Sequence, residues 1–307
     1  MGYRQIYVRK SEYLSLKKES LCIKKQSDSE EIYIPIEDIS CILIEDPHTT
    51  ITTRLLTEMS KNGITTFLCD NTYNPNTQIL PLNIHYNQLG VYNKQISLQD
   101  NLKRKLWQKI VKAKIHNQKM VISFTCNDEY DFQLLDGYEK SVKINDVDNR
   151  EGIASKVFFT SLYGDDFIRF STSHISKALN YGYTIIHGAI VRILVLYGFN
   201  TYLGIWHDSN QNAFNLASDF IEPLRPIVDY WCYWMQNAIE SPLSTDNRKG
   251  LISLLNEKVL IGGKSCTVDY AIDTMIKSYL SFLDTQQIAG ILLPEIVGLN
   301  FHELESV

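Results

Sequence analysis

The stretch Ser171–Asn200 constrains the fold more than any other part of the chain, because after Tyr181 it is apolar on nearly every side. A helix that is apolar all round is stable in water only when other elements cover it completely. No apolar run approaches the ~20 residues that a membrane-spanning helix needs. We therefore expect a protein without a membrane segment, built around one buried central helix, with His187 as a hydrogen-bonded core residue.

The residue pattern divides the chain into two parts. A chain of 307 residues exceeds the ~250–300 residues at which a single core stops growing. Residues 71–95 are rich in turn signals, include Pro75 and Pro81, and are interpreted as a linker. We predict an α+β fold with two domains: a small N-terminal β-sandwich over 1–70 and a larger, mainly α-helical domain over 96–307. The runs predicted as strands are Tyr3–Val8, Tyr13–Leu16, Ser20–Lys24, Glu31–Ile36, Ser40–Ile44 and Ile64–Cys69.

Cysteine usage and the N-terminus indicate a cytoplasmic protein. The six cysteines are scattered and form no CxxC pair, so they are expected to be reduced thiols. The N-terminal residues MGYRQIYVRK lack the apolar core of a signal peptide. The formal net charge of −5 argues weakly against nucleic-acid binding when the chain is taken whole. What matters for such binding is where the positive charge is concentrated.

Positive charge is concentrated between Asn101 and Lys119, a stretch without a single acidic residue. One interpretation is a helix face that is merely solvated. The other is a surface for an anionic partner, of which a polyphosphate backbone is the commonest. The sequence favours neither interpretation over the other. The basic residues are Lys103, Arg104, Lys105, Lys109, Lys112, Lys114 and Lys119.

Glu151 allows a structural and a functional interpretation. Asp148 or Asn149 is able to cap a helix, and Glu151 follows Asp148 by three residues, which is the spacing of a capping box at a helix N-terminus. In the functional interpretation, the carboxylate of Glu151 instead faces a catalytic cleft. Behind it, Ala154, Phe158 and Leu162 keep the spacing of a helix face that packs on the core.

A third segment, Gly204–Pro226, places one histidine ahead of two acids. His207 lies in a polar loop, whereas Asp219 and Glu222 are three residues apart and would share one helix face. Pro223 breaks or kinks that helix. A histidine and a carboxylate that meet at a helix break are able to ligate a divalent ion, although an exposed loop histidine is the simpler interpretation of His207.

Taken together, three segments resemble the CRISPR spacer-acquisition integrases, in the form found in members that accompany single-protein-effector systems. The segments are Asn149–Gly164, Ala178–Asn200 and Gly204–Pro226. They contain, in order, a glutamate, a buried helix that starts LNYGY, a histidine, and D-x-x-E before a turn with proline and arginine. The resemblance implies an N-terminal β-sandwich and a C-terminal helical catalytic domain, as the residue pattern also predicts.

The resemblance also implies an activity and a site. Carried over by position, the catalytic metal ligands are Glu151, His207 and Glu222. The implied reaction is attack of a DNA 3′-hydroxyl on a phosphodiester of a CRISPR repeat, which inserts a foreign fragment. The implied partners are double-stranded DNA (protospacer and repeat), a second copy in a homodimer, and a small ferredoxin-like adaptation protein. Other adaptation and effector proteins of the same system are further candidate partners. Many relatives have aspartate in place of Glu222, so Asp219 remains open as the acid that touches the ion.

Two carboxylates and one imidazole suit Mn²⁺ or Mg²⁺, because both ions prefer oxygen ligands and leave positions for phosphate and water. The imidazole shifts the preference toward Mn²⁺. In that site the ion would act as a Lewis acid on the phosphate. With water as the nucleophile, the same site would cleave DNA.

Three other functions fit parts of the sequence. A metal-dependent nuclease for branched DNA would use the same residues without integration. A non-catalytic DNA-binding scaffold would need only the basic stretch, with Glu151 as a cap and His207 exposed. A small-molecule metallohydrolase is disfavoured, because the sequence has no HExxH pattern.

Overall fold

The computed structural model describes residues 2, 4–10, 12–25, 31–82, 85–126 and 128–299. The chain folds into two compact units, residues 1–86 and 87–307. The range 71–95, predicted as a linker, contains the strand β8 (Pro75–Ile79) and most of the helix α2 (Gln88–Ser97). Pro75 opens the edge strand β8, where its missing N–H is tolerated. The first proline signal in this range therefore marks a strand start, in place of the predicted break.

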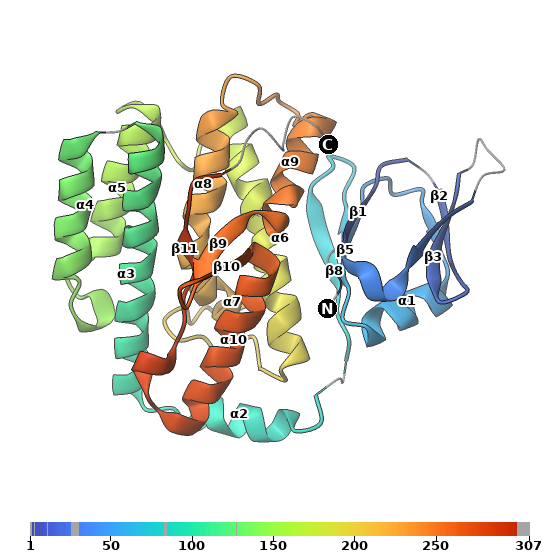
Figure 1. Cartoon of the computed structure of the whole chain (residues 1–307), viewed down its shortest axis with the longest axis horizontal. Helices are drawn as coiled ribbons and strands as arrows, with labels where there is room; N and C mark the ends of the chain where they lie inside the picture. The colour runs from blue at the N-terminus through green and yellow to red at the C-terminus, as the bar shows by residue number, and fades with distance from the viewer. Residues whose placement is uncertain are drawn as a thin grey trace. The chain divides into compact units, whose positions relative to one another are not determined.

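In its described residues, the first unit contains two four-stranded sheets and the helix α1. Figure 1 shows β2 and β3 of one sheet and β1, β5 and β8 of the other. In the order β1-β5-β7-β8, the first three strands are parallel neighbours and β8 is antiparallel to β7. In the order β4-β3-β2-β6, the first three strands are antiparallel and β6 is parallel to β2. The bounds are β1 Arg4–Val8, β2 Glu12–Lys17, β3 Ser20–Lys25, β4 Glu31–Pro35, β5 Ile39–Ile44, β6 Thr50–Ile51, α1 Thr53–Lys61 and β7 Thr65–Cys69, with a 3₁₀ turn at Ile36–Asp38.

One hydrophobic core joins both sheets to α1. Leu14 and Leu21 contribute from the second sheet, Ile42 from the first, and Leu55 from the helix, all with no exposed surface. The helix begins at Thr52, whose side chain accepts a hydrogen bond from the Leu55 amide at 3.4 Å. Apolar residues of the predicted strands face this core, and β5 is in addition buried at all six of its positions.

The second unit is mainly helical and also contains a small antiparallel sheet of order β10-β9-β11. The predicted helical domain therefore needs one correction, because Gly262 and Gly263 form the turn of a β-hairpin. Both glycines have positive φ angles, 56° and 75°, as two-residue hairpin loops require. The remaining elements are α3 Asp100–Thr125, α4 Glu129–Ser141, α5 Arg150–Tyr163, α6 His174–Leu196, α7 Asn215–Phe220, η3 Glu222–Leu224, α8 Arg225–Trp234, α9 Thr245–Ser253, β9 Lys258–Ile261, β10 Lys264–Thr267, α10 Val268–Thr285 and β11 Glu295–Ile296.

The central buried helix predicted from the sequence is α6. Most of its side chains are buried, including Leu179, Ile186 and Ile190 with no exposed surface. By length and composition α6 would also pass for a membrane-crossing helix, but 72% of its most apolar window is covered by the rest of the protein. Its apolar surface is thus explained by packing inside the unit.

The helix α3 is the second organising element. It packs against α4 and α5, and α3, α4 and α5 lie side by side (Figure 1). It also contacts α8 and η3, the 3₁₀ turn that follows α7. Because α5 carries Glu151 and η3 carries Glu222, α3 lies between the two predicted carboxylate ligands.

Candidate metal centre

Glu151 lies in the first turn of α5, but other residues cap that helix. The Asn149 side chain accepts from the Gly152 amide at 3.3 Å, and Asp146 accepts from the amides of Arg150 and Glu151 at 2.8 and 3.0 Å. Of the two residues predicted as caps, Asn149 therefore caps the helix, whereas Asp148 pairs with Lys143 at 2.8 Å. The structure therefore does not support the capping interpretation of Glu151, and its carboxylate is free to make other contacts.

The carboxylate of Glu222 lies in the turn η3 between α7 and α8 and is buried. Its Oε1 accepts from Arg225 Nε at 2.8 Å, and its Oε2 accepts from Lys114 Nζ at 2.6 Å. Burial raises the pKa of Glu222, but the positive charges of Lys114 and Arg225 outweigh burial and lower that pKa to about 2. Glu222 is therefore ionised at neutral pH.

Lys114 connects the two glutamates. Its ammonium donates to Glu151 Oε1 as well as to Glu222 Oε2. Ser155 Oγ, one turn further along α5, also lies 3.2 Å from Glu151 Oε1. Burial lowers the pKa of Lys114, but the two carboxylates raise it further, so the net direction is upward. The two predicted ligands from α5 and η3 thus converge on one cation.

His207 is held by Asp219, which is completely buried in α7. The Asp219 carboxylate accepts from the backbone amides of Ile205 at 2.5 Å, Trp206 at 3.3 Å and His207 at 3.0 Å. His207 Nδ1 lies 2.8 Å from Asp219 Oδ1, and this hydrogen bond is the main reason why the pKa of His207 is raised. Donation from Nδ1 leaves Nε2 of the neutral ring as the nitrogen able to ligate.

The tight turn before His207 depends on Gly204. A Cβ atom at this position would lie 2.1 Å from the backbone oxygen of His207 and 3.0 Å from Asp219 Oδ2. Only glycine therefore lets the chain fold around the Asp219 carboxylate. The His207 ring also meets Trp107 edge-on, with ring centroids 5.9 Å apart.

All three predicted site residues line one cavity of about 620 Å³. Within the described part of the chain, however, no three His, Cys, Asp or Glu side chains are close enough together to form a ready cluster for a metal ion. What the structure shows is a pair of carboxylates around the Lys114 ammonium and a histidine in the wall of the same cavity. This donor set fits a hard divalent cation, because both carboxylates already face a positive charge and one imidazole nitrogen is able to accept. The cavity wall also includes Trp107, Trp206, Arg225 and Asp229.

Comparison with known proteins identifies the family. The sequence profile of the family described as CRISPR associated protein Cas1 matches residues 6–241. This chain belongs to the Cas1 family. It is 34% identical over 307 residues to the CRISPR-associated endonuclease Cas1 of Neisseria meningitidis serogroup C, covering 99% of this chain and 100% of the relative. It is 23% identical over 290 residues to a CRISPR-associated endonuclease Cas1 of Francisella tularensis subsp. novicida, covering 86% of this chain and 90% of the relative.

Solved structures show the same fold. A casposase bound to its integration product superposes with a TM-score of 0.75 at 20% identity, covering 94% of this chain and 92% of that chain. A Cas1 protein from Thermotoga maritima gives a TM-score of 0.71 at 14% identity, covering 92% of this chain and 97% of that chain. At these identities the likeness concerns the fold alone, and it confirms the predicted mixed α+β class.

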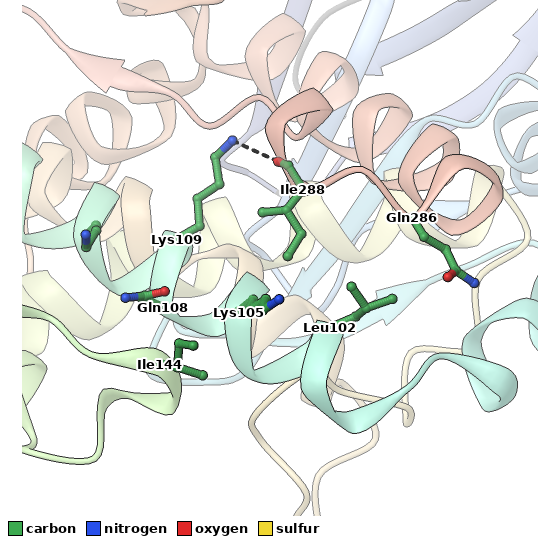
Figure 2. A pocket seen from close by; sticks show the side chains of 8 residues that line it. Leu102, Lys105, Gln108, Lys109, Ile144, Gln286 and Ile288 are labelled. Atoms are coloured by element: carbon green, nitrogen blue, oxygen red, sulfur yellow. Dashed lines mark hydrogen bonds between the residues drawn. The ribbon is translucent and has the colours of Figure 1, made fainter.

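The structure separates the basic stretch of this Cas1 family member into two groups. Lys109 Nζ donates to the backbone carbonyl of Ile288 at 3.1 Å (Figure 2). It also donates to the carbonyl of Ile291 at 2.5 Å, and burial lowers the pKa of Lys109. Lys114 binds the two glutamates described above, and Lys119 pairs with Asp136 and Glu139. Among the contacts of the described residues, no ion pair involves the other four: Lys103, Arg104, Lys105 and Lys112.

Sequence reasoning missed the polar face of α3 that holds the site together. Asn117 is fully buried and donates to the carbonyls of Pro223 at 2.6 Å and Pro294 at 2.9 Å. Gln118 donates to Ser155 Oγ at 3.2 Å. Together with Lys114, these side chains fix η3 and α5 against the same helix.

Proposed function

We propose that this protein is a metal-dependent DNA integrase and endonuclease that inserts foreign DNA fragments into a CRISPR array. The observation that carries the proposal is the convergence of Glu151 and Glu222 on one cation in a cavity that His207 also lines. Membership of the Cas1 family supports it. The casposase of similar fold, which was solved bound to an integration product, points to the same class of chemistry.

In the proposed reaction, a 3′-hydroxyl oxygen of the incoming fragment loses its proton and forms a bond to a repeat phosphorus. The bond from that phosphorus to the repeat 3′-oxygen breaks, and this oxygen leaves with a proton. Glu151, Glu222 and His207 would hold Mn²⁺ or Mg²⁺, which supplies Lewis-acid stabilisation of the phosphate oxygens when bound. Arg225 fixes the Glu222 carboxylate through Oε1, and Asp219 fixes the tautomer of His207.

One assay tests the proposal against its alternatives. A labelled duplex with free 3′-hydroxyl ends is incubated with a supercoiled plasmid that carries a CRISPR repeat, with Mn²⁺, Mg²⁺ or a chelator. We expect joined products only with a divalent ion and only from ends that carry a 3′-hydroxyl. Cleavage without joining would favour the branched-DNA nuclease. DNA binding that is equal with chelator, without any covalent product, would favour the scaffold.

We also propose an assembly with a second copy and with a small ferredoxin-like adaptation protein, in the cytoplasm. Complexes described as Cas6-RT-Cas1–Cas2 share this fold, one of them with a TM-score of 0.72 at 18% identity, covering 94% of this chain and 36% of that chain. A net charge of −5 limits what this chain alone offers to DNA. We expect a dimer by light scattering at micromolar concentration, and duplex affinity that increases when the partner is added. A monomer in light scattering would contradict the proposed dimer. A duplex affinity that the partner does not change would contradict the proposed complex. We further propose that this protein accompanies a single-protein-effector CRISPR system, because its D-x-x-E motif has the form found in such family members.

The unpaired lysines of α3 are proposed as DNA contacts. Lys105 and Lys112 line a second cavity of about 490 Å³, and Figure 2 shows it between α3 and the residues Gln286 and Ile288. We expect Lys105→Glu with Lys112→Glu to weaken binding of all DNA sequences. The slope of log K against log salt should become shallower by about 1–2, because each lost phosphate contact removes ~0.9.

The control for this charge reversal is Lys140→Glu with Lys258→Glu, which changes the net charge equally at two exposed sites outside the cavity. Fluorescence anisotropy across a salt series measures both double variants. If the salt slope of the Lys105 and Lys112 variant equals that of wild type, these lysines do not contact DNA and the helix face is merely solvated. Lys109→Met should instead lower the melting temperature, because its ammonium is bound to two backbone carbonyls.

A further inference from the structure

We propose that Lys114 is a built-in counter-ion of this site, a positioning residue whose ammonium competes with a divalent cation for the carboxylates of Glu151 and Glu222. The inference rests on the proposed function, because it concerns the same carboxylates. It assigns a role to a residue outside the predicted ligand set. The role is to hold the two ligands together and to weaken metal binding at the same time.

The geometry places a single charge at the point where the ligands meet. Lys114 is 7% exposed, and its ammonium contacts one oxygen of each glutamate. The two carboxylates belong to separate elements, α5 and η3, which lie 37 and 108 residues from Lys114 along the chain. Two carboxylates this close together repel each other unless a cation lies between them. Lys114 therefore attracts both carboxylates and holds α5 and η3 close to each other at this point.

The charges around the site are balanced before any ion is added. Glu151 and Glu222 contribute two negative charges, and Lys114 and Arg225 contribute two positive charges in direct contact with them. A divalent ion at these carboxylates would meet the like charge of Lys114 at short range. Binding it thus requires the ammonium to leave at least one glutamate. Asp229 is buried, lines the same cavity and interacts electrostatically with Lys114. Its carboxylate would attract the ammonium of Lys114 once that ammonium leaves a glutamate.

The test is the Mn²⁺ affinity of Lys114→Met, measured by the electron paramagnetic resonance signal of free Mn²⁺ and by melting temperature. We expect the variant to melt at a lower temperature than wild type in the presence of chelator. We also expect it to bind Mn²⁺ about tenfold or more tightly, because residues that contact metal ligands change metal affinity on this scale. Its melting temperature should also rise more steeply with Mn²⁺ than that of wild type, as mass action requires of a tighter ligand. If the methionine variant fails to fold, Lys114→Gln is expected to change affinity in the same direction.

Lys119→Met is a matched control on the same helix. Lys119 is also 7% exposed and bridges two carboxylates, those of Asp136 and Glu139. Both acids keep a second partner, since Lys140 contacts Asp136 and His116 Nδ1 lies 3.3 Å from Glu139. We expect Lys119→Met to lose stability in chelator without gaining Mn²⁺ affinity over wild type. A gain equal to that of Lys114→Met would show a general effect of charge and overturn the inference.

The outcomes separate this inference from the proposed function. Mn²⁺ binding that is equal or weaker in Lys114→Met than in wild type, with strand transfer intact in wild type, would overturn the competition and leave the integrase proposal standing. The absence of Mn²⁺ and Mg²⁺ binding in both proteins would overturn both proposals. Adding Glu222→Gln to Lys114→Met should abolish the gain, because one of the two contested carboxylates is then neutral.

Discussion

Glu222→Gln is expected to reduce strand transfer by about 1,000-fold or more, the scale of several kcal/mol in transition-state stabilisation that a catalytic ion supplies. In wild type the two carboxylate oxygens accept from Lys114 and Arg225. A glutamine has one accepting oxygen, so its NH₂ group would face one of these cations. The variant thus loses a ligand charge and also leaves a buried cation short of a partner.

The same contacts predict a stability cost for this variant. Breaking a buried ion pair by removing one partner costs about 3 kcal/mol or more, although Lys114 retains Glu151 as a partner. Rates are therefore compared at a temperature where circular dichroism shows the variant to be folded. Glu139→Gln is the matched control, because Glu139 also binds a buried lysine, Lys119, at 2.7 Å but lies outside the cavity. If Glu222→Gln loses no more strand-transfer activity than Glu139→Gln, Glu222 is not a metal ligand.

The other two predicted ligands should behave as one unit with Glu222. Glu151→Gln and His207→Ala are each expected to cost as much strand transfer as Glu222→Gln. Combining any two should add little, because a single site is lost only once. Rates across a Mn²⁺ titration measure this, and additive losses would indicate separate roles.

The buried elements of the fold could be predicted because local pattern alone decides them. α6 is apolar on nearly every side, and its burial follows without knowledge of its neighbours. The strands of residues 1–70 could also be predicted from local pattern, since short apolar runs between polar turns are typical of strands that share a core. The hairpin at Gly262 and Gly263 carries an equally local signal, a two-residue glycine loop, but the same glycines also suit the predicted break between helices.

The role of Lys114 could not be predicted by counting charges along α3. Its helical spacing held a signal: Lys114 lies four residues after Ile110 and three after Val111, and both of these are fully buried. The spacing predicts burial for Lys114 but says nothing about its partners. Those partners come from α5 and η3, far along the chain, so only the tertiary structure reveals that a lysine in a basic stretch belongs to the cavity of the predicted site.

Asp219→Asn is expected to have a much larger effect than its position beside the predicted ligand Glu222 suggests. The Asp219 carboxylate has no exposed surface and receives the amides of Ile205 and His207 as well as His207 Nδ1. An asparagine offers one accepting oxygen, and its NH₂ group would face donors. Each buried donor left without a partner costs about 1–3 kcal/mol, so we expect a loss of unfolding free energy of about 2–4 kcal/mol.

Asp273→Asn controls for this loss of stability. Asp273 is 3% exposed and its carboxylate accepts from Tyr197 at 2.8 Å and Lys277 at 2.6 Å, in contacts that do not involve the site. Both variants should melt below wild type, but only Asp219→Asn should also slow strand transfer in the folded protein, by about 10–100-fold. Raised Mn²⁺ should restore part of that rate, because the ring is misoriented but still present.

The pH dependence distinguishes a positioning role for Asp219 from simple destabilisation. Its hydrogen bond raises the pKa of His207, so protons compete with a metal ion for the ring up to a higher pH than for a free histidine. In Asp219→Asn that pKa should fall, and the acid limb of the rate profile should move to lower pH although the maximal rate is lower. Nuclear magnetic resonance titration of the His207 ring measures the pKa directly. A His207 pKa unchanged in Asp219→Asn, with an acid limb at the wild-type pH, would mean that Asp219 supports the loop backbone alone.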